Sequence, residues 1–113
     1  MMQLDRGDIV LVDFNPAKGG EMGKLRPAII LSDSDDNEIL DTVIVIPLSS
    51  YIEENAMPYR YLISKRDKLL KDSDACVYEV RALSKTRVKD KLSRLDDTEL
   101  DDIQNSLCQI IKQ

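Results

Sequence analysis

Histidine is absent from this chain, and cysteine and aromatic residues are scarce. Without histidine the protein lacks a histidine general base and the most common zinc ligand. Cys76 and Cys108 both lie among apolar residues, so we interpret them as small buried side chains and not as a disulfide framework. No apolar run approaches membrane-spanning length, and the N-terminus lacks the apolar region of a signal peptide. These absences predict a soluble, cytoplasmic protein.

The charges are unevenly distributed along the chain. The 113 residues carry a net charge of −5, which alone argues against a nucleic-acid-binding protein. Residues 59–94 nevertheless hold eleven basic and five acidic residues, and acidic segments flank them on both sides. Solvated surface charge is the ordinary explanation of such a pattern. The alternative is a basic face on an otherwise acidic molecule, within one domain that spans residues 1–113.

Short apolar stretches separated by polar turns predict a series of strands. They cover residues 9–14, 25–32, 42–48, 58–63, 75–83 and 88–95. Pro47 is expected to mark the end or an edge of the third strand, because proline lacks the N–H needed inside a sheet. The acidic residues 33–37 are expected to form a polar turn, and the basic residues 64–71 a connector with at most one helical turn.

The hydrophobic pattern changes to helical spacing near the C-terminus. Asp96 and Glu99 match the two positions of a capping box. The apolar positions that follow are Leu100, Ile103, Leu107 and Ile110. One amphipathic C-terminal helix is therefore predicted. Five or six strands and this helix predict a mainly β protein of the α+β type, either a strongly bent sheet or a small barrel with the helix packed on it.

A glycine-rich loop ends in an arginine–proline pair and leads into a buried strand. Proline disfavours the helical conformation of the preceding residue, so Arg26 is expected to be extended. Pro27 suits the first position of a strand, and residues 28–31 are apolar enough to be buried on both faces. The pattern places a positive charge at the mouth of a strand, where functional residues often lie.

Common catalytic motifs are absent. No nucleophile elbow, P-loop or dinucleotide fingerprint is present. The acidic residues between 33 and 41 lack the spacing of a calcium loop, so no metal site is expected there. Arg26 and Ser49 remain, and they can meet at one edge of the sheet if strands 25–32 and 42–48 are neighbours. Taken singly, Arg26 is more simply explained as a surface arginine and Ser49 as a turn residue.

Two blocks of sequence resemble the MazF/PemK family, toxins of type II toxin–antitoxin modules that act as messenger RNA interferases. They are Arg-Gly-Asp-Ile-Val-Leu-Val-Asp-Phe-Asn-Pro at residues 6–16 and Gly-Glu-Met-Gly-Lys-Leu-Arg-Pro-Ala-Ile-Ile-Leu-Ser at residues 20–32. The similarity continues through residues 45–50, 80–87 and 95–97, and so covers almost the whole chain. The resemblance implies an SH3-like barrel with a C-terminal helix, a homodimer, and an endoribonuclease that cuts single-stranded RNA without a metal or cofactor.

The resemblance also assigns roles to individual residues. It implies that Arg26 is catalytic and that Ser49 is its hydroxyl partner, at a position where many members have threonine. If the alignment shifts by one residue, Ser50 takes that role. Glu21 matches the glutamate of the family's loop, a substrate contact, and Lys24 in the same loop is a further substrate-binding candidate.

The fifth predicted strand departs from the family. Where members often carry a Glu-Gln pair that faces the substrate, this chain has Tyr78-Glu79, so Glu79 is the remaining substrate-binding candidate there. Tyr51, Tyr59 and Tyr78 are candidates for stacking on RNA bases. The resemblance further implies a cognate antitoxin, and we expect it to lay an acidic, extended segment over Arg26.

RNA can be cut without a metal when the neighbouring 2′-hydroxyl attacks the phosphate, which leaves a 2′,3′-cyclic phosphate and a 5′-hydroxyl. A guanidinium suits the negative charge that develops on the phosphoryl oxygens, and this predicts charge stabilisation as the first role of Arg26. Two other functions are weighed. One is a toxin of the same fold that poisons a topoisomerase, which the glycine-rich loop disfavours. The other is a non-catalytic SH3-like binding module, which the lack of clustered aromatic residues disfavours.

Overall fold

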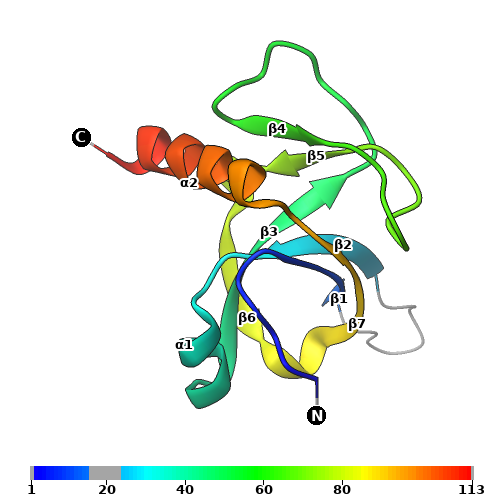
Figure 1. The fold of residues 1–113 in the computed structure, drawn as a ribbon, viewed down its shortest axis with the longest axis vertical. Helices are drawn as coiled ribbons and strands as arrows, with labels where there is room; N and C mark the ends of the chain where they lie inside the picture. The colour runs from blue at the N-terminus through cyan, green and yellow to red at the C-terminus, as the bar shows by residue number, and fades with distance from the viewer. Residues whose placement is uncertain (1, 16–23, 113) are drawn as a thin grey trace.

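The computed structural model describes residues 2–15 and 24–112, and most of them belong to a bent antiparallel sheet (Figure 1). The strands are β1 (Asp8–Asn15), β2 (Lys24–Ile30), β3 (Thr42–Ser49), β4 (Arg60–Ile63), β5 (Ser73–Cys76), β6 (Arg81–Ser84) and β7 (Val88–Arg94). Their order is β4-β5-β3-β2-β1-β7, with β6 also paired to β3. Within the described residues no ladder joins β4 to β7, so the predicted mainly β fold is confirmed as a bent sheet that is not closed.

The C-terminal helix α2 (Asp97–Ile111) forms as the sequence predicts and lies across one end of the sheet (Figure 1). Asp96 accepts a hydrogen bond from the backbone N–H of Glu99, and the Glu99 side chain accepts one from the N–H of Asp96. This capping box satisfies two amides at the start of the helix. Ile103 is wholly buried, and the Tyr61 hydroxyl lies 2.7 Å from the Asp102 carboxylate. The helix is thereby fixed to β4 and to the core.

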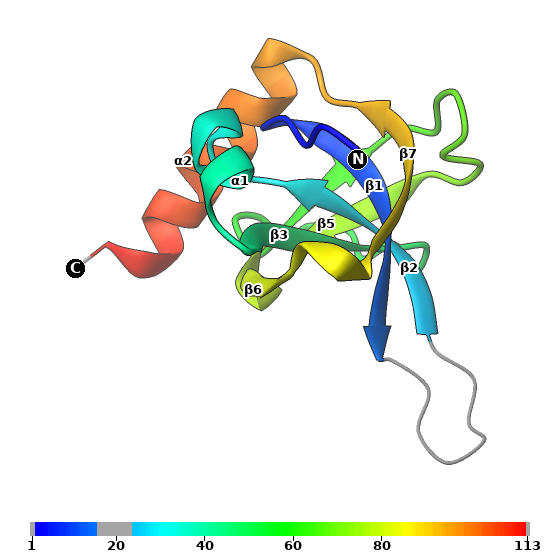
Figure 2. The ribbon, with the colours of Figure 1, turned by 90° about the horizontal axis from the view of Figure 1, so that it is seen from below.

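Alternate residues of the central strands enter two separate cores, as the period of a strand requires. Ile9, Ile29 and Ile46 belong to the core that includes Ile103 of α2. Val10 and Ala28, one residue away in each strand, belong to a second core inside the curve of the sheet. Figure 2 shows β1, β2, β3 and β7 curving around a common interior. The sheet is thus buried on both faces where its strands are most apolar.

The prediction of a polar turn at residues 33–37 is wrong, because these residues begin the short helix α1 (Ser34–Ile39). Asp33 caps it by accepting a hydrogen bond from the N–H of Asp35. Asn37 is buried, and its side-chain amide donates to the carbonyls of Leu4 and Ser32. Polar side chains therefore hold this helix in place. A helix held in this way lacks the hydrophobic periodicity from which helices are predicted.

The single strand predicted at residues 75–83 is wrong as well. The chain forms β5, then the 3₁₀ turn η1 (Val77–Glu79), and then β6. The break allows β5 to pair with the end of β3 and β6 to pair with its beginning. Pro47 is not at the end of β3 but inside it, opposite Ala28. It lies between the last residue paired with β6 and the first paired with β5, where a missing N–H interrupts neither ladder.

Two smaller predictions also need correction. The segment 64–71 contains no helical turn; it is a tight loop in which the backbones of Arg66 and Leu69 exchange two hydrogen bonds. Cys108 is exposed, because its position in α2 lies off the apolar stripe. Cys76 is buried, as predicted.

The start of α2 is also tied to the 64–71 loop by a bidentate ion pair between Arg66 and Glu99, with N–O distances of 2.5 and 2.6 Å. The hydrogen bond from Arg66 lowers the pKa of Glu99 from 4.5, against the opposing effect of burial. A carboxyl group whose pKa is lower in the folded state stabilises the protein above its unfolded pKa, and this contribution is lost as the pH falls through the folded value. Stability should therefore decline below about pH 4.5 in part through Glu99.

We expect Glu99→Gln to remove that part of the acid sensitivity, because glutamine does not titrate. Urea unfolding at pH 7 and pH 3 would show a smaller loss of stability in the variant than in the wild type. Glu38→Gln is the matched control, since Glu38 is exposed on α1. Equal losses in Glu99→Gln and the wild type would contradict this assignment.

Candidate active site

A cavity of about 770 Å³ opens where the sheet fails to close. Its wall is formed by the beginning of β2, the end of β3, the loop before β5, and single residues of β1 and β7. The lining residues are Leu11, Lys24, Leu25, Arg26, Pro27, Leu48, Ser49, Ser50, Lys68, Leu69, Leu70, Lys71, Ser73 and Leu92. Four of the predicted site residues, Lys24, Arg26, Ser49 and Ser50, therefore share one hollow.

Arg26 is held by contacts from the two strands that neighbour its own. It lies in β2 opposite Val12 of β1, and its Nη2 donates a hydrogen bond of 3.2 Å to the carbonyl of Leu48 in β3. Its guanidinium carbon also lies 5.9 Å from the centre of the Phe14 ring, within the range of a cation–π contact. These contacts leave the partly buried guanidinium with a defined position. They use only part of its five N–H donors.

Ser49 lines the same cavity as Arg26. The β2–β3 ladder ends with Ala28 opposite Pro47, and Arg26 and Ser49 each lie two residues beyond that pair. The Ser49 Oγ accepts a hydrogen bond of 3.2 Å from the N–H of Tyr51, so its own proton remains available for donation. Ser50 lines the cavity one residue later and is exposed.

The remaining predicted site residues lie elsewhere. Glu79 is exposed in η1 and does not line the cavity, and neither does Tyr78 beside it. Tyr78 and Tyr59 contact each other edge to face, with ring centres 6.0 Å apart. Tyr51 is exposed but is likewise absent from the lining. Glu21 lies outside the described residues.

A buried carboxylate supports the segment that follows Ser49. Asp74 pairs with Ser49 in the β3–β5 ladder, and its side chain is 3% exposed. It accepts a hydrogen bond of 2.9 Å from the N–H of Glu53 and one of 3.3 Å from Arg60. Burial opposes the charge on Arg60, but the hydrogen bond to Asp74 and the nearby acidic groups raise its pKa overall. The pair orders the chain just beyond the two serines.

Four residues of this region were not identified from the sequence. Phe14 contacts Arg26, and the Arg81 guanidinium lies 5.7 Å from the centre of the same ring. An aromatic residue at the end of the first predicted strand was the available signal for Phe14. Lys68 and Lys71 line the cavity from the loop before β5. The basic composition of residues 59–94 indicated that cations gather in this part of the chain. Only the fold shows which of them line the Arg26 cavity.

Other kinds of site find little support in the described residues. Cys76 is a poor nucleophile, because burial raises the pKa of its thiol. In residues 2–15 and 24–112, no three acidic, cysteine or histidine side chains gather as they would around a metal ion. No helix of this part of the chain is long and apolar enough to cross a membrane.

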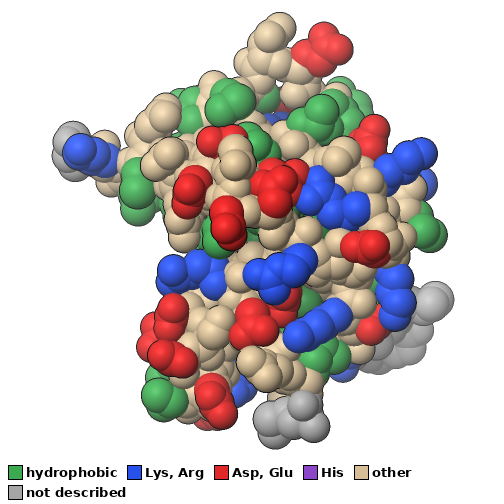
Figure 3. Space-filling view, in the orientation of Figure 1, with side chains coloured by type: hydrophobic (Ala, Val, Ile, Leu, Met, Phe, Trp, Pro, Cys, Tyr) green, Lys and Arg blue, Asp and Glu red, His purple; other side chains and the backbone are tan. Residues whose placement is uncertain are grey.

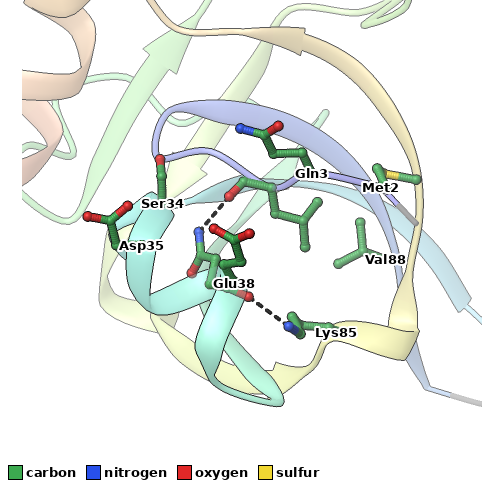
Figure 4. Close-up of a pocket in the computed structure, with 9 residues that line it drawn as sticks. Met2, Gln3, Ser34, Asp35, Glu38, Lys85 and Val88 are labelled. Atoms are coloured by element: carbon green, nitrogen blue, oxygen red, sulfur yellow. Dashed lines mark hydrogen bonds between the residues drawn. The ribbon is translucent and has the colours of Figure 1, made fainter.

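A second cavity of about 570 Å³ lies between the N-terminal segment, α1 and the start of β7 (Figure 4). Its wall combines the carboxylates of Asp35 and Glu38 with apolar side chains such as Val88. Lys85 donates a hydrogen bond to the carbonyl of Asn37 at its edge. None of the predicted site residues lines it, and its mixed charge contrasts with the cationic lining around Arg26.

The surface charges separate into regions, as the sequence suggested. Acidic side chains gather over α2 and over α1, and lysine and arginine side chains lie between and beside them (Figure 3). The cavity around Arg26 is lined by four cations, Lys24, Arg26, Lys68 and Lys71, and by no acidic residue of the described parts of the chain. Such a hollow favours a ligand with negative charge.

Comparison with known proteins gives one consistent result. Residues 5–111 match the family model described as PemK-like, MazF-like toxin of type II toxin-antitoxin system. The chain is 35% identical over 103 residues to the protein named Endoribonuclease MazF of Staphylococcus saprophyticus, covering 90% of this chain and 86% of that protein.

Solved structures show the same fold. The crystal structure of MazF from Deinococcus radiodurans superposes with a TM-score of 0.79 at 20% identity and covers 100% of both chains. A MazE-MazF crystal structure from the same organism gives a TM-score of 0.80 at 20% identity and covers 98% of this chain and 97% of that one.

Proposed function

We propose, because the chain belongs to the family of PemK-like, MazF-like toxins of type II toxin–antitoxin systems, that it is an endoribonuclease that cuts single-stranded messenger RNA at a preferred sequence. The Staphylococcus saprophyticus relative is an endoribonuclease by name. The observation that carries the proposal is the position of Arg26, which a fixed set of contacts holds in a hollow lined by cations.

The proposed reaction needs no group from outside the chain and the RNA. The 2′-hydroxyl of one nucleotide attacks the adjacent phosphorus atom, and the bond to the 5′-oxygen of the next nucleotide breaks. The 2′-oxygen loses its proton and the departing 5′-oxygen gains one, so the products are a 2′,3′-cyclic phosphate and a 5′-hydroxyl. Negative charge accumulates on the phosphoryl oxygens as the reaction proceeds, and catalysis requires donors aimed at that charge.

Arg26 is assigned to stabilising that negative charge. Its planar guanidinium can donate to two phosphoryl oxygens at once, which suits it to charge stabilisation and not to proton transfer. Ser49 is assigned to orienting the phosphate. Its Oγ accepts a hydrogen bond from the N–H of Tyr51, so the hydroxyl proton is still available to donate to the phosphate. Lys24 at the rim of the cavity is assigned to substrate binding, and Ser50 is the alternative hydroxyl partner.

Digestion of a defined single-stranded RNA, followed by mapping of the ends, tests this function. We expect cuts at a short recurring motif, with 2′,3′-cyclic phosphate and 5′-hydroxyl ends and with the same rate in EDTA. Products with 5′-phosphate ends, or a rate abolished by EDTA, would overturn the proposed chemistry. Inhibition of a topoisomerase by a preparation that leaves RNA intact would support the alternative toxin, and no activity in either assay would support a binding module.

The proposed partners follow from the same family and from the charge of the cavity. We expect a homodimer, which sedimentation at micromolar concentration would detect. We also expect a cognate antitoxin that places an acidic, extended segment over Arg26, since such a segment matches the cationic lining. Solved MazE-MazF structures are among the structural neighbours. A complex that left the Arg26 cavity open would contradict the proposed mode of inhibition.

A further inference from the structure

We propose that the loop between β4 and β5, residues 64–72, is an RNA-binding arm whose Lys68 and Lys71 contact phosphates flanking the one that is cut. This inference rests on the proposed function, and it assigns a task to residues that no motif identifies. The arm forms one wall of the Arg26 cavity, because Lys68, Leu69, Leu70 and Lys71 all line it.

The first argument is the contrast between the arm and the rest of the molecule. The protein has a net charge of −5, so its average surface repels RNA. A single catalytic arginine cannot hold a polyanion against that repulsion, since backbone affinity comes from several phosphate contacts. The arm supplies two of the four cations that line the cavity, and the described residues contribute no acidic side chain to that lining.

The second argument is the rigidity of the arm. Leu69 is only 3% exposed and anchors the tip of the loop in the core. The N–H of Lys68 donates a hydrogen bond of 3.1 Å to the carbonyl of Leu92 in β7, which bridges the gap between the two ends of the sheet. Arg66 adds the ion pair with Glu99 of α2. The two lysines are therefore presented from a fixed backbone, which lowers the entropic cost of binding.

The third argument is the availability of the two ammonium groups. Within the described residues, the Lys71 ammonium has neither a hydrogen bond nor an ion pair. The side chain of Lys68 is 67% exposed, and its Nζ lies 3.6 Å from an Asp90 carboxylate that is itself 51% exposed. An exposed pair of this kind contributes little to stability, so a phosphate can replace Asp90 at small cost. Leu70 between them is 80% exposed and offers apolar surface to a base.

The test compares Lys68→Gln/Lys71→Gln with Lys89→Gln/Lys112→Gln, a control that removes the same charge from two exposed lysines outside the cavity. The probe is a short single-stranded RNA that carries the motif cut by the wild type, with a 2′-deoxy nucleotide at the cleavage position to prevent reaction. Its affinity is measured over a range of salt concentrations. Each phosphate contact to single-stranded RNA contributes about 0.7 to the slope of log affinity against log salt.

We expect the arm variant to lose about 1.4 from this slope, and the control to keep the wild-type slope. In cleavage assays of the arm variant, KM should rise while kcat stays unchanged. The charge-preserving variant Lys68→Arg/Lys71→Arg should keep the wild-type salt slope. If the wild type cuts RNA but the arm variant keeps the wild-type salt slope, the proposed role of the arm is overturned and the proposed function is not. An equal loss in the control would also overturn that role, and a wild type that cuts no RNA would overturn the arm and the proposed function together.

Discussion

Replacing Arg26 by alanine is expected to lower RNA cleavage about 100- to 1,000-fold, the usual effect of removing one donor aimed at a developing negative charge. The fold should survive, because the guanidinium lines an open cavity and makes one described hydrogen bond, to the carbonyl of Leu48 near the end of β3. The measurement is single-turnover cleavage of one mapped RNA, with circular dichroism as the check on folding. A folded Arg26→Ala protein that cuts at the wild-type rate would remove the proposed catalytic role.

Companion variants separate charge from geometry at this site. Arg26→Lys should be nearly as inactive as Arg26→Ala, since an ammonium cannot reproduce two parallel hydrogen bonds to a phosphate. Ser49→Ala should have a milder effect, and Ser49→Thr should retain activity because the hydroxyl is kept. Arg94→Ala is the matched control, because Arg94 lies at the end of β7, outside the cavity, with a side chain that is 60% exposed. A comparable loss in Arg94→Ala would indicate a general effect of net charge.

Replacing Ile103 by alanine is expected to lower the free energy of unfolding by about 2–5 kcal/mol, the range found for truncating a large buried aliphatic side chain. Ile103 is fully buried in the core shared by α2 and the strands, where it lies with Ile9, Ile29 and Ile46. The cavity left behind cannot close unless α2 moves closer to the sheet, which its other contacts oppose. Most domains have a stability of only about 5–15 kcal/mol, so this loss should be visible as a large shift of the urea midpoint.

Ile111→Ala provides the control on the same helix. Ile111 is 64% exposed, and substitutions at such positions usually change stability by less than about 0.5 kcal/mol. The two variants have the same chemical change and similar helix propensity effects, so their difference reports burial. If Ile103→Ala unfolded at the same urea concentration as Ile111→Ala, the packing of α2 on the sheet described above would be wrong.

The sequence predicted those parts of the fold whose stability comes from repeated burial. The strands β1, β2 and β3 contain short continuous apolar runs, the helix α2 follows a hydrophobic pattern of period 3.6, and the capping box marks the start of the helix. Helix α1 was missed because it depends on buried polar contacts of Asn37. The break between β5 and β6 was missed because both sides of it are apolar.

The candidate site, like the fold, was predicted only in part from the sequence. That Arg26 and Ser49 lie near one hollow could be anticipated from the sequence, because each adjoins a strongly apolar strand and the two strands follow each other along the chain. Lys68 and Lys71 could not be distinguished from other lysines in the basic segment, since their position depends on a loop folded back against β7. Glu79 was expected near the substrate because it matches the position of the family's Glu-Gln pair, but it is exposed in η1 and does not line the cavity.

The open edge of the sheet also bears on how the protein is made. Arg26 and Ser49 belong to the first half of the chain, whereas the cavity around them is completed by the 64–72 loop and by Leu92 of β7, which pairs with β1. Ribosomes deliver a protein from its N-terminus, so Arg26 and Ser49 emerge well before the wall that encloses them. A toxin of this architecture therefore completes the wall of its cavity only after Leu92 has left the ribosome, well after Arg26 and Ser49.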